Sequence, residues 1–492
     1  MKPQKIILIF SLIAILCFPG YTLALPVLPG AQGVSAETVA GRGGTVYKVT
    51  NLNDSGSGSF RACAEASGAR ICVFETSGWI ALTSPIMISN PYITIAGQTS
   101  PGGIGIRATT GFSDGQNPGM VYINTHDVLI THMRFAMGAM LSGGIGGDTL
   151  RIWGNNYSTN DPSPDNSGVY NIYIDHCSIR WGCDECGETG YNPNRVTIAW
   201  SIIGPGLYNC HPDGESNHDL GWLYWGPYTS SSAQFSFHHN FHAHVRYRMP
   251  YTSRSILDAW NNVTFDGYGA YTGPLLALEG GKINYRNNYC KKVSGYGNSG
   301  SSGREITGTW KGSSYAAAYL DDNIGCYRTA GQDDWLSIED EYSGNTLSTS
   351  WKSDTPFSIT HGISPTITTM TASYAAKVVS GAGATKPVTD SVDQTCKTNF
   401  TNGTHARYDG TVTGNEASDW PTLSGGSPPT DSDNDGMSDA WEIATFGNLT
   451  QTASGDYDSD GYTNIEEYMH YLGGYVGSEA PAQPTGLVIR PQ

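Results

Sequence analysis

Two short stretches of the sequence carry the side chains best suited to chemistry. Residues 172–188 end in Asp184 and Glu188, whose carboxylates could serve a calcium site, because Ca²⁺ takes oxygen ligands in flexible geometry. The two acids lie four residues apart, so an extended chain would put both on one face, where their charges repel unless a cation joins them. Residues 237–250 contain Arg248, a cation that could stand opposite those acids, with a structural ion pair as its alternative role.

A second set of acids, near the C-terminus, matches the calcium loop of an EF-hand twice. The expected ligands are Asp431, Asp433, Asp435, Met437, Asp439 and Glu442 in the first copy, and Asp456, Asp458, Asp460, Tyr462, Asn464 and Glu467 in the second. In both copies position 6 is glycine and position 7 would contribute a backbone carbonyl. The copies resemble thrombospondin type 3 or dockerin-like repeats of exported bacterial proteins, in which calcium would fold a spacer rather than take part in catalysis.

Short strands are the elements that must position these side chains. Runs such as Tyr92–Ile95 and Ile172–Ile174 are β-branched or aromatic and are separated by Gly, Asn and Asp. Local sequences recur in steps of 22 and 26 residues, as at Asn240, Asn262 and Asn288. This period predicts an all-β parallel solenoid, in which the asparagines stack at equivalent turns and satisfy one another and the backbone. An antiparallel sandwich is the alternative, but hairpin signals such as Asn-Gly are scarce.

The N-terminus has the features of a secretory signal peptide. Lys2 and Lys5 precede an apolar run over residues 6–18, and cleavage is expected after Ala24. The run is too short for a membrane anchor, which needs about 20 apolar residues. We therefore expect residues 1–24 to be removed and the mature protein to be secreted, with no membrane partner.

Nine cysteines would remain after cleavage, and most should pair in an exported protein. Cys63 and Cys72 could close a small loop. Cys183 and Cys186 form a C-x-x-C pair, for which a zinc site would want a second such pair and a redox site a thioredoxin-like context. Neither context is present, so a structural disulfide holding the acidic loop is expected there.

Charge is distributed unevenly along the chain. The net charge is -17, and more than half of it comes from ten acids between residues 430 and 468, a segment without Lys or Arg. We expect a β-solenoid domain over 25–423, a linker at 424–429, a calcium-binding module at 430–475 and a flexible tail at 476–492. The acidic balance does not suggest a nucleic-acid partner, and a monomer is expected.

Five landmarks in order resemble those of polysaccharide lyase family one. They are Gly30–Gly33 with Gly41–Asp54, then Ile95–Pro101, Tyr173–His176 and Arg248–Pro250. The resemblance extends from about residue 30 to about residue 290. It implies a right-handed parallel β-helix with the substrate lying along one outer face. It also implies a pectate lyase, which uses calcium to cleave polygalacturonate by β-elimination.

By that resemblance, Asp148 from the preceding coil joins Asp184 and Glu188 as protein ligands of the catalytic calcium, although family members often carry Asp at the last position. Calcium would acidify the proton at C5, next to the uronate carboxylate. Arg248 would remove that proton. Because the pKa of arginine exceeds about 12, this role predicts an alkaline optimum.

The sequence departs from the family pattern at two places. Ser253 stands where a second arginine is expected, five residues after Arg248, and Arg254 follows one place later. A lysine expected between the acids and Arg248 is missing. Arg246 and Arg254 are therefore the candidates for binding the substrate carboxylate.

Other functions and other metal sites stay open at this stage. A pectin lyase, which acts on methyl esters without calcium, would not need the three acids together. A non-catalytic polysaccharide-binding β-helix would explain the repeats but not the arginine set opposite carboxylates. Alternate histidines share a strand face and could suggest a transition metal, but packed or hydrogen-bonded roles are favoured for His238, His239, His242 and His244.

Overall fold

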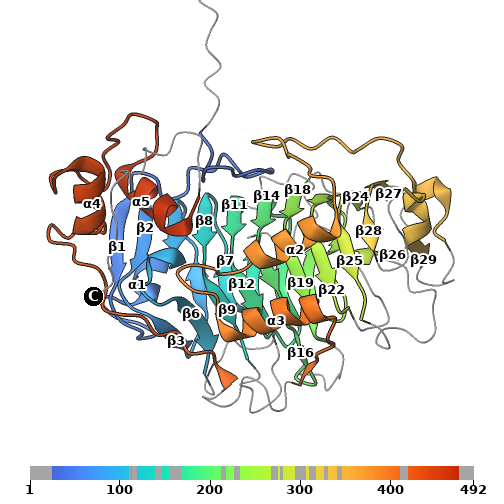
Figure 1. The fold of residues 1–492 in the computed structure, drawn as a ribbon, viewed down its shortest axis with the longest axis horizontal. Helices are drawn as coiled ribbons and strands as arrows, with labels where there is room; N and C mark the ends of the chain where they lie inside the picture. Colours follow the sequence, from blue (N-terminus) through green and yellow to red (C-terminus); the bar gives the residue numbers. More distant parts are fainter. Residues whose placement is uncertain are drawn as a thin grey trace, which may run out of the picture.

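The computed structural model describes residues 25–109, 112, 119–138, 147–154, 168–211, 218–225, 233–267, 275–277, 281–293, 306–309, 317–325, 331–340, 346–409 and 419–475. Three parallel sheets run along its long axis, and from β2 onward each described coil of the chain gives one strand to each sheet (Figure 1). The predicted β-solenoid is therefore confirmed. The predicted signal peptide and C-terminal tail lie outside the described residues, within which no helix is long and apolar enough to cross a membrane.

Neighbouring strands in each sheet come from successive coils. Sheet one contains β1 (Thr45–Val49), β2 (Arg70–Phe74), β5 (Ile93–Ala96), β8 (Val128–Thr131), β11 (Tyr170–Asp175), β14 (Asn194–Ala199), β18 (Gln234–His238), β21 (Ile256–Trp260), β24 (Lys282–Arg286) and β27 (Ala317–Asp321). Sheet two contains β4 (Ile86–Ile88), β7 (Gly119–Ile123), β10 (Asp148–Trp153), β13 (Glu185–Gly190), β17 (Leu220–Trp225), β20 (Tyr251–Ser253), β23 (Leu275–Ala277), β26 (Ile306–Thr309) and β29 (Ile338–Asp340). Sheet three contains β3 (Gly78–Leu82), β6 (Ile104–Ala108), β9 (Arg134–Ala136), β12 (Ser178–Arg180), β15 (Ile202–Ile203), β19 (Phe241–Ala243), β22 (Val263–Phe265), β25 (Tyr289–Lys291) and β28 (Ile324–Gly325). A separate parallel pair joins β16 (Leu207–Tyr208) to β30 (Tyr408–Asp409).

The core is a set of apolar rows that run through the coils. In sheet one, the register places Ile93, Val128, Ile172, Val196 and Phe235 beside one another on five successive strands. All five are buried in the largest apolar cluster. Burying each such side chain contributes about 1.5–3 kcal/mol, and a coil gains this only when its neighbours cover it.

A ladder of asparagines links the turns that lead into sheet three. The backbone N–H of Asn240 donates to Oδ1 of Asn262 at 3.0 Å, that of Asn262 to Asn288 at 2.9 Å, and that of Asn288 to Asn323 at 3.0 Å. The side-chain amides also bond along the same row. The predicted stacking of recurring asparagines is confirmed, and the structure adds Asn323 to the row.

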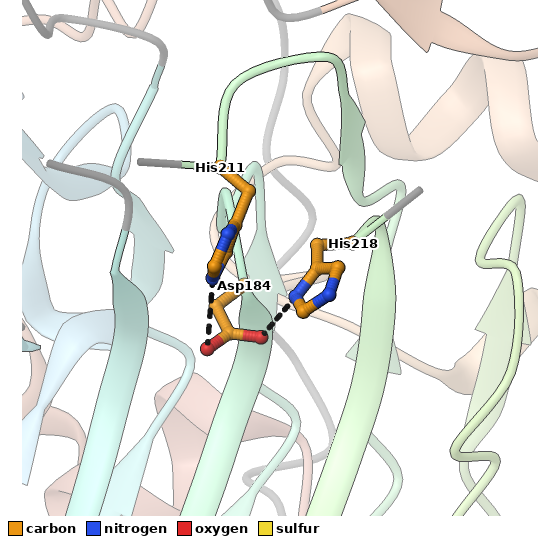
Figure 2. A group of neighbouring side chains, drawn as sticks. All are labelled: Asp184, His211 and His218. Atoms are coloured by element: carbon orange, nitrogen blue, oxygen red, sulfur yellow. Dashed lines mark hydrogen bonds and ion pairs between the residues drawn. The ribbon is translucent and has the colours of Figure 1, made fainter. Parts of the chain in front are cut away.

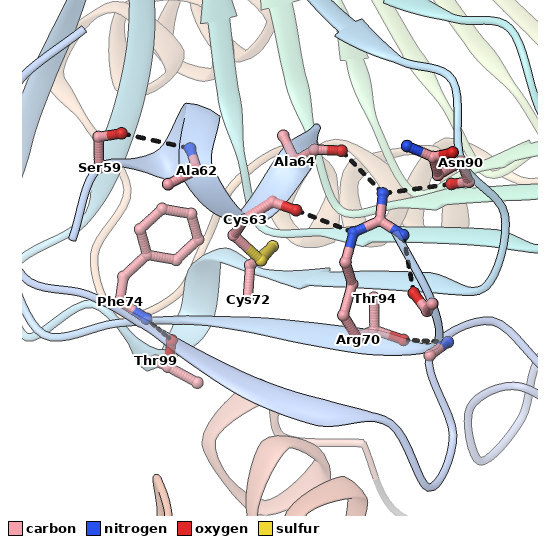
Figure 3. The surroundings of a disulfide bond; sticks show 12 residues. Ser59, Ala62, Cys63, Ala64, Arg70, Cys72, Phe74, Asn90, Thr94 and Thr99 are labelled. Carbon is pink, nitrogen blue, oxygen red and sulfur yellow. Dashed lines mark hydrogen bonds between the residues drawn. A yellow bond between two sulfur atoms is a disulfide. The ribbon is translucent and has the colours of Figure 1, made fainter. Parts of the chain in front are cut away.

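A short helix, α1 (Phe60–Ala64), lies beside the first coil. Figure 3 shows the predicted Cys63–Cys72 disulfide, which ties α1 to β2. In the same view the buried Arg70 guanidinium donates to the carbonyls of Cys63 at 2.8 Å and Ala64 at 2.7 Å. These contacts satisfy carbonyls at the end of α1 and fix it against the β-helix.

Two longer helices, α2 (Ala372–Gly381) and α3 (Ser391–Asn402), lie along sheet three (Figure 1). Arg180 in β12 is fully buried and pairs with Asp390 and Asp393 at the start of α3, each at 2.9 Å. Removing one partner from such a buried pair costs about 3–5 kcal/mol, so these pairs fix the position of α3. The shorter 3₁₀ turns are η1 (Gly97–Thr99), η3 (Asp334–Ser337) and η4 (Thr349–Trp351).

Residues 430–475, predicted as a module behind a linker, pack directly on the β-helix. Helices α4 (Asp439–Phe446) and α5 (Asn464–Gly473) lie beside the first strands of sheet one (Figure 1), whose outward Ile71 and Val73 join their apolar cluster. Ion pairs of 2.9 Å and 2.8 Å connect Arg42 to Glu466 and Lys48 to Asp431. The proposed domain boundaries stay predictions, but this segment does not stand apart from the first coils.

Candidate active site

Acidic residues meet where two neighbouring strands of sheet two begin. Asp148 is the first residue of β10, Asp184 immediately precedes β13, and Glu185 is the first residue of β13. One carboxylate oxygen from each lies within 4.8 Å of the others. We call these three residues the acid group. At this spacing each pair of charges repels by about 3.5 kcal/mol at an effective dielectric constant of about 20, so the group favours a cation.

Asp148 is fully buried and is bound from two sides. Arg151 Nε donates to its Oδ2 at 2.7 Å, and the backbone N–H of Glu185 donates to its Oδ1 at 2.9 Å. Burial raises the pKa of Asp148, and the charge of Asp184 acts in the same direction while Arg151 opposes both. Arg151 therefore offsets part of the charge of the acid group, and the N–H of Glu185 holds Asp148 toward β13.

Asp184 is contacted by two histidines that the sequence did not single out. Figure 2 shows both rings converging on its carboxylate, with His218 Nδ1 3.0 Å from Oδ1 and His211 Nε2 3.7 Å from Oδ2. Burial acts to raise the pKa of Asp184, but the contacts with the two histidines outweigh it and hold that pKa well below its ordinary value. Asp184 is therefore ionised throughout the neutral and alkaline range.

Glu188, predicted as the third calcium ligand, is paired with Arg151. The two residues stand side by side in the register of β13 with β10, and Arg151 Nε lies 3.3 Å from Glu188 Oε2. Trp153 Nε1 donates to the same oxygen at 2.9 Å. The acids that come together in one group are Asp148, Asp184 and Glu185, while Glu188 makes a side-chain hydrogen bond with Asp148.

Arg248 lies against the acid group. It precedes β20, adopts a positive φ of 65°, and its guanidinium forms an ion pair with Glu185. The same guanidinium lies 5.4 Å from the ring centroid of Tyr247 and 5.6 Å from that of Tyr251. Burial lowers the pKa of Arg248, although the negative charge of Asp184 acts in the opposite direction. The predicted approach of this arginine to the acids is therefore present.

The two arginines predicted to bind substrate lie on either side of Arg248 in sequence. The Arg246 guanidinium lies 5.9 Å from the ring centroid of Tyr247, and its backbone N–H donates to the carbonyl of Asp219 at 2.8 Å. Arg254 is half-buried in the turn between β20 and β21. Their role in substrate binding remains a prediction.

The disulfide expected between Cys183 and Cys186 is wrong. Cys183 pairs with Cys210, whose Cα lies 5.2 Å away, and Cys186 is a buried free thiol. Cys186 begins the inward row of β13, where it packs in the core, so it points away from Cys183. The observed disulfide joins the residue before Asp184 to the residue before His211, a link that spacing alone could not reveal.

The predicted packed roles of the four clustered histidines agree with their contacts. His238 stacks on Trp260 at 4.4 Å between ring centroids, and His239 stacks on Trp200 at 4.5 Å. His244 Nδ1 lies 2.7 Å from Asp266 Oδ2. The remaining member, His242, stacks on Phe237 within the core.

The two C-terminal loops adopt matching conformations. Gly436 and Gly461 have φ of 98° and 99°, and their N–H groups donate to the first acid of each loop, Asp431 at 2.9 Å and Asp456 at 3.1 Å. Within each loop, the acids at positions 1, 3 and 5 bring their oxygens within 4.8 Å of one another. At position 9, Asp439 accepts the N–H of Ser432 at 2.7 Å in the first loop, and Asn464 accepts the N–H of Tyr457 at 3.0 Å in the second. At position 7, the N–H of Met437 donates to Asp435, and that of Tyr462 donates to Asp460.

The last acid of each loop is held in an unfavourable environment. Glu442 is fully buried, and neither of its carboxylate oxygens has a hydrogen-bond partner within the described part of the chain. Burial, reinforced by the charge of Asp435, raises its pKa to about 7. Burial and the charge of Asp458 likewise raise the pKa of Glu467 to about 8. A buried carboxylate of this kind is stable only when a proton or a bound cation neutralises its charge.

Comparison with known proteins gives one consistent result. The chain is 31% identical over 474 residues to the probable pectate lyase C of Aspergillus oryzae, covering 94% of this chain and 97% of that protein. It is 30% identical over 478 residues to the probable pectate lyase C of Aspergillus terreus, covering 95% and 98%. Among solved structures, the major cedar pollen allergen jun a 1 matches with a TM-score of 0.50 at 14% identity, over 72% of this chain and 92% of that chain. No family model matches.

The chain is a right-handed parallel β-helix with an arginine set against an acid group on one sheet, and its similarity to the Aspergillus proteins makes it a polysaccharide lyase. Within that class, the full-length similarity to the Aspergillus proteins places the chain in the pectate lyase family. The pollen allergen, at its low identity, supports the fold alone.

Proposed function

We propose that the chain is a calcium-dependent pectate lyase that cleaves polygalacturonate by β-elimination to unsaturated oligogalacturonides. The observation that carries the proposal is the contact between Arg248 and the acid group, which sets a proton acceptor beside a cation site. The names of the relatives support the substrate class. The predicted signal peptide supports export of the enzyme.

The acid group fits calcium by the chemistry of its donors. Asp148, Asp184 and Glu185 offer carboxylate oxygens, which Ca²⁺ prefers, within one ion-sized space. Calcium held there would bind the uronate carboxylate and lower the pKa of the adjacent C5 proton. We assign Glu188 to a supporting role, since its charge is matched by Arg151, which also holds Asp148.

The elimination needs a base that is neutral when it meets the C5 proton. Arg248 would accept this proton as the C5–H electron pair forms the C4–C5 double bond and the C4–O bond breaks, with the leaving oxygen protonated from solvent. Burial lowers the pKa of Arg248, which increases its neutral fraction at alkaline pH. The negative charge of Asp184 acts in the opposite direction, so engagement of Asp184 as a metal ligand would favour the neutral base.

The test is the ultraviolet absorbance of the unsaturated product during incubation with polygalacturonate, with and without a chelator. We expect a chelator-sensitive rise that increases toward alkaline pH and is abolished in Arg248→Ala. Arg195→Ala is the matched control, because this half-buried arginine lies on sheet one, over the ring of Tyr170. No absorbance change at any pH would refute the lyase proposal. A chelator-insensitive rise on methyl-esterified pectin would favour a pectin lyase instead.

The C-terminal loops are proposed as two structural calcium sites. The first would use Asp431, Asp433, Asp435 and Glu442, and the second their counterparts in residues 456–467. The buried Glu442 carboxylate, with no hydrogen-bond partner in the described chain, supports this assignment. Calorimetric titration with calcium is expected to lose one binding event in Asp433→Asn; an unchanged number of events would contradict it.

A further inference from the structure

We propose that Asp184, His211 and His218 form a binding site for a divalent transition-metal ion of the zinc, cobalt or nickel type. The site shares Asp184 with the acid group but is otherwise distinct from it. The other two ligands, His211 and His218, have no part in the calcium proposal. Its consequence for catalysis, described below, rests on the proposed lyase activity.

The three donor groups have the separation that such an ion requires. All three donor atoms lie within 4.8 Å of one another, with His218 Nδ1 and His211 Nε2 at 3.0 Å and 3.7 Å from the two oxygens of Asp184. Two ligands that each lie about 2.0–2.1 Å from a tetrahedral ion are separated by about 3.3 Å. The two measured distances lie just below and just above this value, so small side-chain rotations would complete the coordination (Figure 2).

The kinds of donor decide which metals are preferred. Two imidazole nitrogens with one carboxylate suit zinc, cobalt, nickel or copper, whereas calcium and magnesium prefer sites made of oxygen. The side chains of His211, Asp184 and His218 are 11%, 21% and 21% exposed, so an ion can reach them from solution. Three protein ligands leave a position for water or another ligand.

The surrounding chain holds these residues together. His211 and His218 come from the connection between β16 and β17, and Asp184 comes from the residues before β13. The Cys183–Cys210 disulfide links the neighbours of Asp184 and His211 in sequence. The two imidazole rings lie 3.9 Å apart between centroids. The covalent link reduces the freedom that the ligands would lose when they bind a metal.

Sharing Asp184 makes the two cation sites antagonistic. A carboxylate drawn to a transition metal beside His211 and His218 is less available to the acid group, and the added positive charge would repel calcium. Micromolar zinc is therefore expected to inhibit the lyase, with the inhibition relieved by excess calcium.

The direct test titrates the chelator-treated full-length protein with Co²⁺, whose visible absorption reports nitrogen ligation. One equivalent is expected to give a visible band that Zn²⁺ abolishes. His211→Gln and His218→Gln keep a hydrogen-bond donor for Asp184 but should weaken Co²⁺ binding at least tenfold. His126→Gln is the matched control, since His126 also pairs with a carboxylate, that of Asp127 at 2.8 Å, and is similarly exposed.

The outcome is decided by binding, independently of catalysis. A band that persists in the double variant His211→Gln/His218→Gln, or a wild-type protein without the band, would overturn the proposal. Far-ultraviolet circular dichroism verifies that the variants are folded. In the activity assay, zinc inhibition should disappear in the double variant whatever its remaining rate. If the wild type has no lyase activity, the Co²⁺ titration still tests the site, so the two proposals fail separately.

Discussion

Replacing Glu188 or Glu185 by glutamine distinguishes a structural acid from a calcium ligand. At an effective dielectric constant of about 20, unit charges at the observed Arg151–Glu188 distance interact by about 5 kcal/mol. Breaking a buried pair by removing one partner costs about 3–5 kcal/mol. Arg151 would keep Asp148 at 2.7 Å, and glutamine can still accept from Trp153, so the loss in Glu188→Gln should lie near 3 kcal/mol.

Glu185→Gln should change the calcium requirement more than the stability of the calcium-free protein. It removes two repulsions of about 3.5 kcal/mol each within the acid group, but it also removes the partner of Arg248. Because these effects oppose each other, the calcium-free free energy of unfolding should change less than in Glu188→Gln. The calcium concentration for half-maximal activity should rise at least about tenfold, because a charged ligand has been lost.

The measurements are urea unfolding in chelator and the rate of unsaturated product formation across a calcium series. The calcium concentration at half-maximal activity reports the acid group alone, whereas total calcium binding would also include the C-terminal loops. The reasoning would be refuted if Glu188→Gln raised the calcium requirement tenfold at unchanged stability while Glu185→Gln left that requirement unchanged. Glu188 would then be the third ligand, as the sequence predicted.

Asn262→Leu should lower the free energy of unfolding by roughly 3 kcal/mol or more in urea titrations, because the N–H of Asn240 and the carbonyl of Phe237 lose buried partners at about 1–3 kcal/mol each. Burial lowers the pKa of His242 from 6.5 to about 3. The contribution of the neutral imidazole to stability is therefore complete above pH 6.5 and is lost as the pH falls toward 3. His242→Phe should shift the acid-unfolding midpoint to lower pH. Burial raises the pKa of Glu442 from 4.5 to about 7, so the calcium-free protein should lose stability as the pH rises through that window, and thermal melts of Glu442→Gln should show a smaller loss. Each prediction would be contradicted if its variant behaved like the wild type: Asn262→Leu in urea, His242→Phe in acid unfolding, or Glu442→Gln in the thermal melts.

Much of the fold could be read from the sequence because a solenoid repeats its local pattern. The spacing of Asn240, Asn262 and Asn288 marked equivalent turns, and their hydrogen bonds confirm it. The packing of residues 430–475 on the first coils could not be predicted. It depends on the outward Ile71 and Val73, which look like ordinary strand residues in a linear pattern.

The sequence by itself predicted the kind of chemistry: Asp148 and Asp184 as oxygen ligands, an arginine near them, and two loops with ligand spacing for calcium. Only the tertiary structure decided which neighbours complete the site. Strand register set Arg151 beside Glu188, and the turns and the Cys183–Cys210 disulfide brought His211 and His218 to Asp184. The physical reason is that contacts between coils depend on register and turn length, whereas residue type and spacing describe only one coil at a time.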